Sequence, residues 1–419
     1  MCQYFNFRHM KNKKEEINLD AIAASLAKEV SNGRSLTGND GLMKDLMKKV
    51  IEASLEAEMD EHLAEKGKSS KNRRNGRGRK NILSSSGGLE IFAPRDRDGS
   101  FEPQMIKKRQ RRLDNGIDNK ILSLYGKGLS YRDIQDHLRD IYDVELSVGT
   151  LNAITDKILP EILEWQQRPL ETVYPVMWLD AMHFKVREHG KVVTKAVYNV
   201  LGVNRDGDKQ VLGIYFGDHE SSTFWRSVLH ELEQRGVKDI FVACIDNLSG
   251  FGDAIEDIFP KTDVQLCLVH QMRNSIKYAT HKDVKPLIKD LRGIYTAQNE
   301  NQALQYLKQA EDKWGVKYKA IFRSWNNNWN RLINFYRYPP ALRRVIYTNN
   351  PIESYHRMVR KVTKTKGAFT SENAIVKQLY LATLNAETRW NGRMFAWTSV
   401  RRDLVDYFDN RFLTDDTLN

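Results

Sequence analysis

The chain has 419 residues, of which 41% are hydrophobic and 29% charged, enough for two or three domains with substantial cores. Its formal net charge is +12, and it carries only three cysteines, Cys2, Cys244 and Cys267. Cysteines this sparse exclude a disulfide scaffold, and no apolar run is long enough to span a bilayer. The N-terminus lacks the apolar core of a signal peptide. We therefore expect a cytoplasmic protein, not associated with a membrane, whose cations attract a polyanion, nucleic acid first.

The first part of the chain is predicted to be helical and then strongly basic. Apolar residues at helical spacing predict helices within 1–65, separated by glycine and asparagine around 38–41. From 66 to 80 the sequence holds many cations, no acid and no large apolar residue, and a second basic cluster follows at 107–112. Such a stretch cannot pack a core, so it is either a flexible linker or a phosphate-contacting segment. We favour a basic DNA-contacting segment at 66–112, with these candidate contacts: Lys71, Arg73, Arg74, Arg77, Arg79, Lys80, Lys107, Lys108 and Arg109.

Residues 113–165 are predicted to form a helix-turn-helix-like domain. Three short helices fall between 117 and 158, the second capped by Ser130 and the third, which extends to Ile158, by Ser147. Ile141 is expected on the inner face of the second helix. In a helix-turn-helix the last helix lies in the major groove of DNA, although any small helical bundle would give the same pattern.

At about residue 172 the hydrophobic period changes to that of strands. Segments 173–186, 191–203 and 209–217 are rich in Val, Tyr and Phe and are joined by short polar turns, as in an antiparallel meander. A helix at 222–235, an apolar strand at 240–245, a short helix near 249–258 and a strand at 264–269 follow. This order predicts parallel crossovers and a mixed sheet covered on both faces. Residues 271–345 are predicted helical, with Trp314, Trp325 and Trp329 as core candidates, and the C-terminal part is helical as well.

Two aspartates stand in apolar strand sequences. Asp180 lies inside VMWLDAMHF, and Asp246 directly follows IFVACI. A carboxylate buried among such neighbours is costly unless it meets a cation or hydrogen-bond donors. Each alone could be a strand-end cap or an ion-pair partner. Together, on strands that each deliver an aspartate near the strand end, they indicate a shared site at the sheet edge.

A third acid, Glu353, lies near the start of a helix predicted to begin at about 350, because Pro351 suits the first helical turn. Arg357 and Lys361 follow on the same face, with His356 and Arg360 beside them. This stripe is either a ladder of i,i+4 ion pairs or a metal ligand followed by cations that track a DNA backbone. We take Arg357, Arg360, Lys361 and Lys364 as candidate DNA contacts.

Asp180, Asp246 and Glu353 are hard oxygen ligands of the kind that suits Mg²⁺, with Mn²⁺ as a substitute. Two such ions can activate the attacking oxygen and stabilise the leaving one in an in-line displacement. Cys267 and His270 could begin a zinc site, but no second pair at zinc spacing stands nearby. His270 is expected to end a strand of the same sheet, beside the phosphate or a metal-bound water, and we count it and Cys267 as catalytic candidates.

At these residues the sequence resembles the bacterial branch of the Mutator-type insertion-sequence transposases. The resemblance is carried by RNGR at 74–77, LDAMHFKVR at 179–187, CLVHQMRN at 267–274, TNNPIES at 348–354 and RKVTKTKG at 360–367. It implies that Asp180, Asp246 and Glu353 form the DDE triad of a ribonuclease H-like fold. It places the family's Cys/Asp-x-x-His signature on Cys267 and His270. Asn247, Pro351 and His356 depart from the usual Gly, Ala and Asn.

The resemblance sets the expected architecture and function. We expect an α/β ribonuclease H-like catalytic domain with a mixed sheet at 172–270, an all-helical insertion at 271–345, and the catalytic Glu helix with C-terminal helices at 346–419. The expected function is metal-dependent cleavage and transfer of double-stranded DNA at terminal inverted repeats and target DNA, at the nucleoid, by a homodimer or larger assembly. A domesticated, non-cutting regulator and a junction-resolving nuclease of the same fold are the alternatives. The intact triad argues against the first, and the basic segment with its helix-turn-helix argues against the second.

Overall fold

The structure, a computed structural model, describes residues 18–38, 40–65, 71–84, 87–113, 116–217, 221–248, 250–347, 350–390, 393–408 and 410–413. The chain divides into two compact units. Unit 1 comprises Met1–Ser123 and Tyr131–Ile154, and unit 2 comprises Leu124–Ser130 and Thr155–Asn419. In the part of the chain that is described, no helix is long and apolar enough to cross a membrane.

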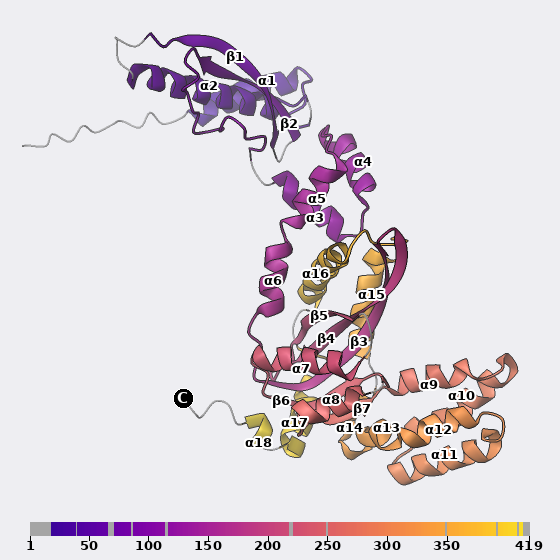
Figure 1. Ribbon diagram of the computed structural model, residues 1–419. Coiled ribbons are helices and arrows are strands. Elements are labelled where there is room, and N and C mark those ends of the chain that lie inside the picture. The colour runs from indigo at the N-terminus through magenta and orange to yellow at the C-terminus, as the bar shows by residue number, and fades with distance from the viewer. Residues whose placement is uncertain are drawn as a thin grey trace, which may run out of the picture. The chain divides into compact units, whose positions relative to one another are not determined.

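Unit 1 begins with two helices and a β-hairpin (Figure 1). The elements are α1 (Leu19–Ser31), α2 (Leu42–Glu65), β1 (Arg74–Ser84) and β2 (Gly87–Asp96). The helices expected within 1–65 are confirmed, and α1 buries none of its residues. α2 packs Ile51 and Leu55 against Ile82, Leu89 and Ile91 of the hairpin.

The expectation that 66–80 is flexible is wrong from Arg74 onwards, whereas the expectation that it contributes no core side chain holds for the described 71–80, and 66–70 lie outside the described residues. From Arg74 the chain is a strand that pairs with β2 in antiparallel register, from Arg74 opposite Asp96 to Ser84 opposite Gly87. Two things stabilise the strand. The apolar Ile82 at its far end is fully buried, and the Arg74 side chain is neutralised by Glu56 and Asp60 of α2.

The three helices of the helix-turn-helix-like segment are present as α3 (Gly116–Gly126), α4 (Tyr131–Tyr142) and α5 (Val148–Asp156). The Ser147 hydroxyl accepts the Thr150 N–H at 3.1 Å, which confirms the predicted cap of α5. Ile141 is 55% exposed, so its predicted inward orientation is wrong, because it lies in the last turn of α4 beyond the buried Ile134 and Leu138. α5 also ends before Ile158, which caps a separate helix, α6 (Leu159–Gln167).

Unit 2 is built on a five-stranded mixed sheet in the order β5-β4-β3-β6-β7 (Figure 1). The strands are β3 (Val173–Glu188), β4 (Lys191–Val203), β5 (Lys209–Gly217), β6 (Asp239–Ile245) and β7 (Asp263–Leu266). β3, β4 and β5 are antiparallel neighbours, whereas β6 runs parallel to β3 and β7 parallel to β6. His189 and Gly190 have positive φ values of 47° and 78° in the turn between β3 and β4, as the tight hairpin requires.

Helices cover both faces of the sheet, as predicted. On one face, the ring centroid of Trp225 in α7 (Ser222–Gln234) lies 4.4 Å from that of Tyr198 in β4. The Trp225 ring also stacks on the ring of Phe251 in α8 (Phe251–Ile258). Neighbouring residues of a strand point to opposite faces. Asn199, next to Tyr198, accordingly meets His356 of α15 (Asn350–Thr363) on the other face.

The region 271–345 is helical, as predicted. Its elements are α9 (Leu268–Lys277), α10 (His281–Thr296), α11 (Glu300–Trp314), α12 (Lys319–Asn327), α13 (Trp329–Ile333), the 3₁₀ helix η1 (Asn334–Arg337) and α14 (Pro340–Ile346). Trp325 is fully buried, whereas Trp314 and Trp329 are half-buried and pack at the edge of the core. After α15 the chain continues through α16 (Glu372–Arg389), α17 (Trp397–Phe408) and α18 (Asn410–Leu413).

Candidate active site

Two aspartates stand where the parallel pairing of β3 with β6 stops. The last paired residues are Leu179 and Ile245, and the next residue of each segment is Asp180 and Asp246. β6 ends there, but β3 continues to Glu188 beside β4. The expectation that both aspartates lie near strand ends therefore holds for Asp246 and is wrong for Asp180. The two aspartates come together because β6 stops at Ile245, which leaves the middle of the longer β3, in the described part of the chain, without a paired strand on that side.

The three predicted acids line one cavity of about 420 Å³. Asp180 comes from β3, Asp246 follows β6, and Glu353 comes from the first turn of α15. Six basic or imidazole side chains share the cavity, namely those of His183, His270, Arg273, His356, Arg357 and Arg360. Glu353 thus faces the two aspartates across the cavity, where α15 meets the sheet.

Two of the predicted DNA contacts, Lys361 of α15 and Lys364 just after it, do not line this cavity. For Lys361 this contradicts the expected stripe from Glu353 through Arg357. Eight residues of α-helix place Lys361 about 80° around the axis from Glu353. Arg357 and Arg360 lie within about 40° of Glu353, and they do line the cavity.

Asp180 is held in a nearly dry environment and is only 7% exposed. Its Oδ1 accepts the Ala181 N–H at 2.8 Å, and its Oδ2 faces Nδ1 of His356 at 3.5 Å. Burial, together with the nearby charge of Asp246, raises the pKa of Asp180 to about 7. A carboxyl group in this position gains a proton readily unless a cation is brought to it.

His356 is a buried, neutral neighbour of Asp180. Burial, and then the charges of Arg360 and His270, lowers the pKa of His356 to about 3. The Asn199 side-chain amide lies 3.3 Å from its Nε2. With that amide donating, Nδ1 carries the ring proton and presents it to Asp180. The pair of Asn199 and His356 therefore lies directly against the Asp180 carboxylate.

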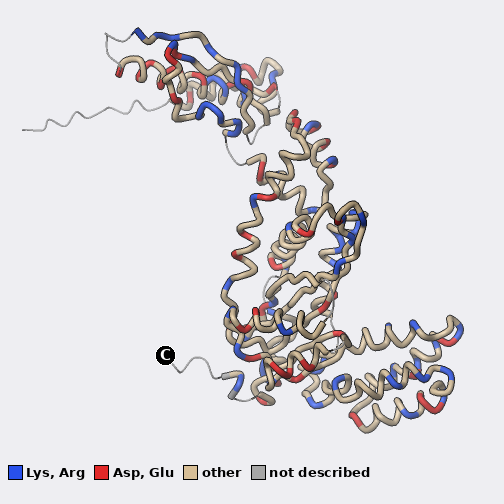
Figure 2. The backbone as a smooth tube through the Cα atoms, in the orientation of Figure 1, with Lys and Arg blue, Asp and Glu red and all other residues tan. Residues whose placement is uncertain are grey.

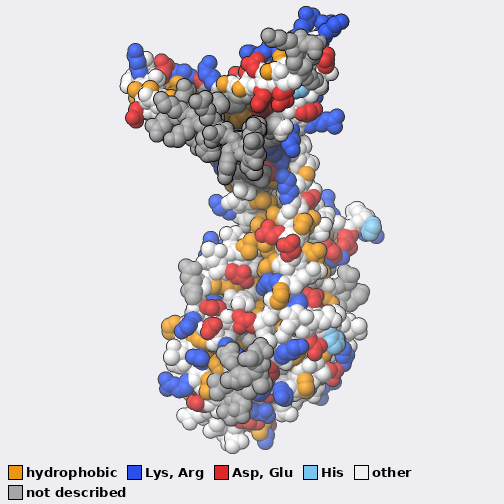
Figure 3. Space-filling view, turned by 90° about the vertical axis from the view of Figure 1, so that its left-hand side faces the viewer, with side chains coloured by type: hydrophobic (Ala, Val, Ile, Leu, Met, Phe, Trp, Pro, Cys, Tyr) orange, Lys and Arg blue, Asp and Glu red, His pale blue; other side chains and the backbone are white. Residues whose placement is uncertain are grey.

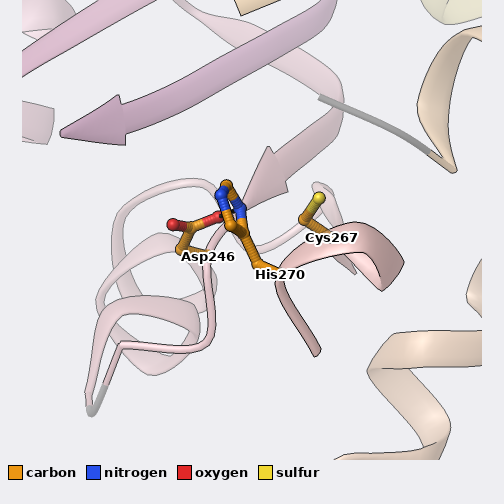
Figure 4. Close-up of side chains that lie close together, drawn as sticks. All are labelled: Asp246, Cys267 and His270. Carbon is orange, nitrogen blue, oxygen red and sulfur yellow. Dashed lines mark ion pairs between the residues drawn. The ribbon is translucent and has the colours of Figure 1, made fainter. Parts of the chain in front are cut away.

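Asp246, His270 and Cys267 form a compact cluster (Figure 4). One ligand atom of each lies within 4.8 Å of the others, and Nδ1 of His270 forms an ion pair with Oδ1 of Asp246. Burial alone would lower the pKa of His270, but the hydrogen bonds to Asp246 and Cys267 outweigh it and raise the pKa to about 10. Cys267 and His270 thus lie beside Asp246, and a position of His270 next to a phosphate or a metal-bound water stays a prediction.

The predicted strand at 264–269 ends earlier than expected, and His270 is not at a strand end. β7 stops at Leu266, the Cys267 N–H donates to the Ile245 carbonyl, and α9 begins at Leu268. The apolar run VQLCLV continues through this boundary, so hydrophobicity alone does not reveal where β7 ends and α9 begins. His270 therefore lies in the first turn of a helix, which brings Arg273 to the same side one turn later.

Arg273 is a site residue that the sequence did not reveal. Its guanidinium donates to Oε1 of Glu353 at 2.8 Å and lies 3.2 Å from Nε2 of His270. Glu353 is 80 residues further along the chain, a separation that no local spacing can signal. Arg273 links α9 to α15 across the cavity.

A second feature was missed on β3. His183, Lys185 and Arg187 are exposed at alternate positions, while Met182, Phe184 and Val186 between them are buried. His183 also lines the cavity of the three acids. The alternation is readable in the sequence, since strand residues two apart share a face. Figure 2 shows Lys and Arg gathered around the outer ends of β3 and α15.

Comparison with known proteins identifies the family. The family model described as "Transposase, Mutator family" matches residues 20–392 of the chain. The chain belongs to the Mutator family of transposases. It is 40% identical over 398 residues to a probable transposase for insertion sequence element ISRM3-like from Sinorhizobium fredii, covering 94% of this chain and 99% of that protein. It is 38% identical over 400 residues, with the same coverage, to the transposase for insertion sequence element ISRM3 from Rhizobium meliloti. A transposase for insertion sequence element IS905 from Lactococcus lactis is 29% identical over 83% of this chain and 87% of its own length.

In this Mutator-family chain, several of the basic residues predicted to contact DNA in unit 1 are already in ion pairs. Arg77 bonds Glu56 at 2.8 Å, Arg79 pairs with Glu90, and Lys108 pairs with Glu102 at 2.8 Å. Figure 3 likewise shows acidic and basic side chains interspersed over one face of the molecule. Such pairing weakens the field that a phosphate would meet.

Several basic residues of unit 1 line a large cavity of about 1110 Å³. Arg109 and Arg111 line it from the 107–112 segment, together with Ser147 and Thr150 at the start of α5. Among the described residues neither arginine is in an ion pair. Lys80 lines the cavity too, and its ammonium group donates to the Lys107 carbonyl at 2.6 Å. Lys71 and Arg73 are exposed just before β1.

Proposed function

We propose that this chain is the transposase of an insertion sequence, which binds the terminal inverted repeats of its element and cuts and rejoins DNA strands at the cavity of Asp180, Asp246 and Glu353. One observation carries the proposal: three acids from separate elements meet in a cavity that six basic or imidazole side chains also line. Acids serve to bind metal ions and the cations to bind phosphates, and a phosphodiester reaction needs both.

The fold of the catalytic part fits a ribonuclease H-like domain. Three antiparallel strands, β3 to β5, are extended by the parallel β6 and β7, and the acids come from the middle of β3, the end of β6 and a helix on one face. We propose that α9 to α14 are an insertion between the second and third acid of that domain, a DDE-type arrangement.

The three acids fit divalent metal ions, Mg²⁺ first. Their oxygens are hard ligands, and burial, together with the nearby charge of Asp246, raises the pKa of Asp180, so a bound cation would favour its charged form. Two bound ions would supply a stronger attacking oxygen and neutralise the charge on the leaving one. Asp180 and Asp246 would hold the ions from the sheet and Glu353 from the helix. Cys267 and His270 leave a zinc ion only three ligands with Asp246, and we assign His270 to orienting Asp246 instead.

The protein's other residues position the substrate. Arg357 and Arg360 form no ion pair with any described residue, so their guanidinium groups are available to bind phosphate oxygens at the cavity. Arg273 bonds Glu353 and can turn to a phosphate once a metal ion takes over that carboxylate. We assign His356, whose Nδ1 lies 3.5 Å from Oδ2 of Asp180, to orienting that carboxylate. We propose that unit 1 and the α4–α5 helices select the element's ends, within a homodimer or larger assembly.

The test is cleavage of labelled element ends by the full chain, with and without Mg²⁺. Asp180→Asn, Asp246→Asn and Glu353→Gln should each abolish cleavage, by at least about 10³-fold, and leave DNA binding nearly unchanged, since each removes a charge without changing shape. Asp253→Asn is the matched control, because Asp253 pairs with Arg331 outside the cavity. Strong cleavage by any triad variant would remove that residue from the mechanism. Binding without cleavage by the unsubstituted protein would favour a regulator, and a preference for four-way junctions a resolving nuclease.

A further inference from the structure

A second cavity, of about 380 Å³, lies beside the one that holds the three acids. We call it the apolar cavity. Its walls are Val269, Met272 and Ile276 of α9, Ile288 and Tyr295 of α10, and Tyr347 after α14. All six side chains are half-buried, and three of them, Met272, Tyr295 and Tyr347, also pack against the edge of the core. The volume falls in the range of small-ligand sites, and exposed apolar surface of this kind often marks the binding site of a ligand or partner.

The apolar cavity and the acidic one share a single wall residue, Arg273. The sharing follows from the geometry of α9. His270 and Arg273, three residues apart, face the acids, whereas Val269, Met272 and Ile276 lie on the adjoining stripe of the same helix. The Arg273 guanidinium bonds Glu353 at one side, and its stem borders the apolar cavity at the other. A DNA strand whose phosphate is bound in the acidic cavity beside Arg273 therefore has its neighbouring part at the apolar cavity.

Resting on the function proposed above, we propose that the apolar cavity receives one nucleobase of the bound DNA, unstacked from its neighbours and adjacent to the phosphate held at Asp180, Asp246 and Glu353. A base is joined to its phosphate through one sugar, so a phosphate at Arg273 brings a base within reach of both tyrosines. Base faces are apolar and stack on tyrosine rings and on guanidinium planes. Enzymes that act on DNA commonly draw a nucleotide out of the helix in this way.

The lining favours a base over an apolar side chain of a second copy of this chain. Its one charged member is a cation directed at the phosphate-binding side, and cations attract the polyanion to which a base belongs. A base held there would fix the register of the strand relative to the acids. The cavity would thereby help to decide which phosphodiester bond is cut.

The experiment uses the full-length protein in an Asp180→Asn background, so that the DNA stays intact. The fluorescent base 2-aminopurine is placed in turn at each position flanking the cleavage site. One position should brighten on binding, because a base freed from its stacked neighbours is no longer quenched. The increase should be lost with Tyr347→Ala and with Tyr295→Ala and kept with Tyr347→Phe, which retains the ring. Tyr278→Ala is the matched control, since Tyr278 is 66% exposed at the end of α9 and lines neither cavity.

A second measurement separates this role from a structural one. In otherwise unsubstituted protein, Tyr347→Ala should slow cleavage of intact DNA about tenfold, the value of one stacking contact. DNA that lacks the base at the bright position should be cut equally well by both proteins. Equal slowing on both DNAs, or no bright position while cleavage by the unsubstituted protein proceeds, would overturn the inference and leave the proposed function intact. A Tyr347→Ala protein whose dimerisation weakens in sedimentation, with unchanged fluorescence, would assign the cavity to a second copy. Absence of any cleavage by the unsubstituted protein would instead refute the proposed function.

Discussion

The Asp180 carboxylate of the candidate site lowers the free energy of unfolding when it is charged and no metal ion is bound. It is buried beside Asp246, and its pKa is raised to about 7. In the unfolded chain an aspartate has a pKa near 3.9. Between about pH 4 and 7 the folded state therefore binds a proton that the unfolded state has lost, so the free energy of unfolding decreases as the pH rises. Above pH 7 Asp180 is charged in the folded state, and the full free-energy cost of burying that charge is present.

This leads to a prediction for metal-free protein. In EDTA, Asp180→Asn should raise the midpoint of thermal unfolding by about 5 °C at pH 8, because the uncharged amide avoids the penalty. The gain should shrink towards zero at pH 4.5, where the folded protein carries a protonated Asp180. Calorimetry at the two pH values measures the difference. An equal gain at both would mean that the effect comes from packing and not from charge.

Cys267 and His270 allow a second prediction at this scale. Together with Asp246 they provide three ligand atoms, one fewer than a closed structural zinc site needs. Purified protein should therefore contain no stoichiometric zinc. His270→Ala should slow strand cleavage about 10- to 100-fold and change DNA affinity little, because it removes the support of a metal-binding carboxylate. Elemental analysis that finds one zinc per chain, lost in Cys267→Ser, would contradict this assignment.

Among the elements, the basic segment of unit 1 departs most from its expected behaviour. A stretch without acids or large apolar residues predicted a phosphate-contacting segment, yet β1 is a strand whose arginines bond acids of α2 and β2. The acids that neutralise it come from other elements, so composition within the segment could not reveal them. Arg109 and Arg111, by contrast, keep their charge beside the start of α5.

This difference predicts how DNA affinity depends on salt. Replacing Arg109 and Arg111 together by Ala should reduce the slope of log affinity against log salt by about 2, if each arginine displaces one counterion. Arg74→Ala with Arg77→Ala is the matched pair and should reduce the slope by less, because those cations are already neutralised. Titrations of the full chain at several salt concentrations provide the slopes. A larger loss for the β1 pair would show that its ion pairs open on DNA.

The elements around the site were predictable to different degrees, for physical reasons. β3 to β6 were predicted because strand alternation and apolar runs are local signals, and the proximity of Asp180 to Asp246 followed from the parallel crossover. The end of β7 was not predictable, since the apolar run continues into α9. The bond between Arg273 and Glu353 depends on how the helices pack, and local sequence spacing carries no information about that packing.

At the scale of the whole molecule, the division into two compact units separates the two tasks that the proposed function requires. Unit 1 contains the hairpin, the 107–112 segment and α4, and unit 2 contains all three acids. Each unit has its own apolar core, with Leu55 fully buried in unit 1 and Leu229 fully buried in unit 2. Units with separate cores are expected to unfold in separate cooperative transitions.

Calorimetry can test this separation with two matched core substitutions. Leu55→Ala should lower only one transition and Leu229→Ala only the other, each by the loss of about 3 kcal/mol that truncating a buried leucine causes. Mg²⁺ should raise the transition that Leu229→Ala lowers, because ions held by Asp180, Asp246 and Glu353 stabilise only the unit that contains them. Asp246→Asn should abolish that increase. A single transition that both leucine variants and Mg²⁺ move together would show that the two units unfold as one, and metal binding could then not be assigned to unit 2 by this route.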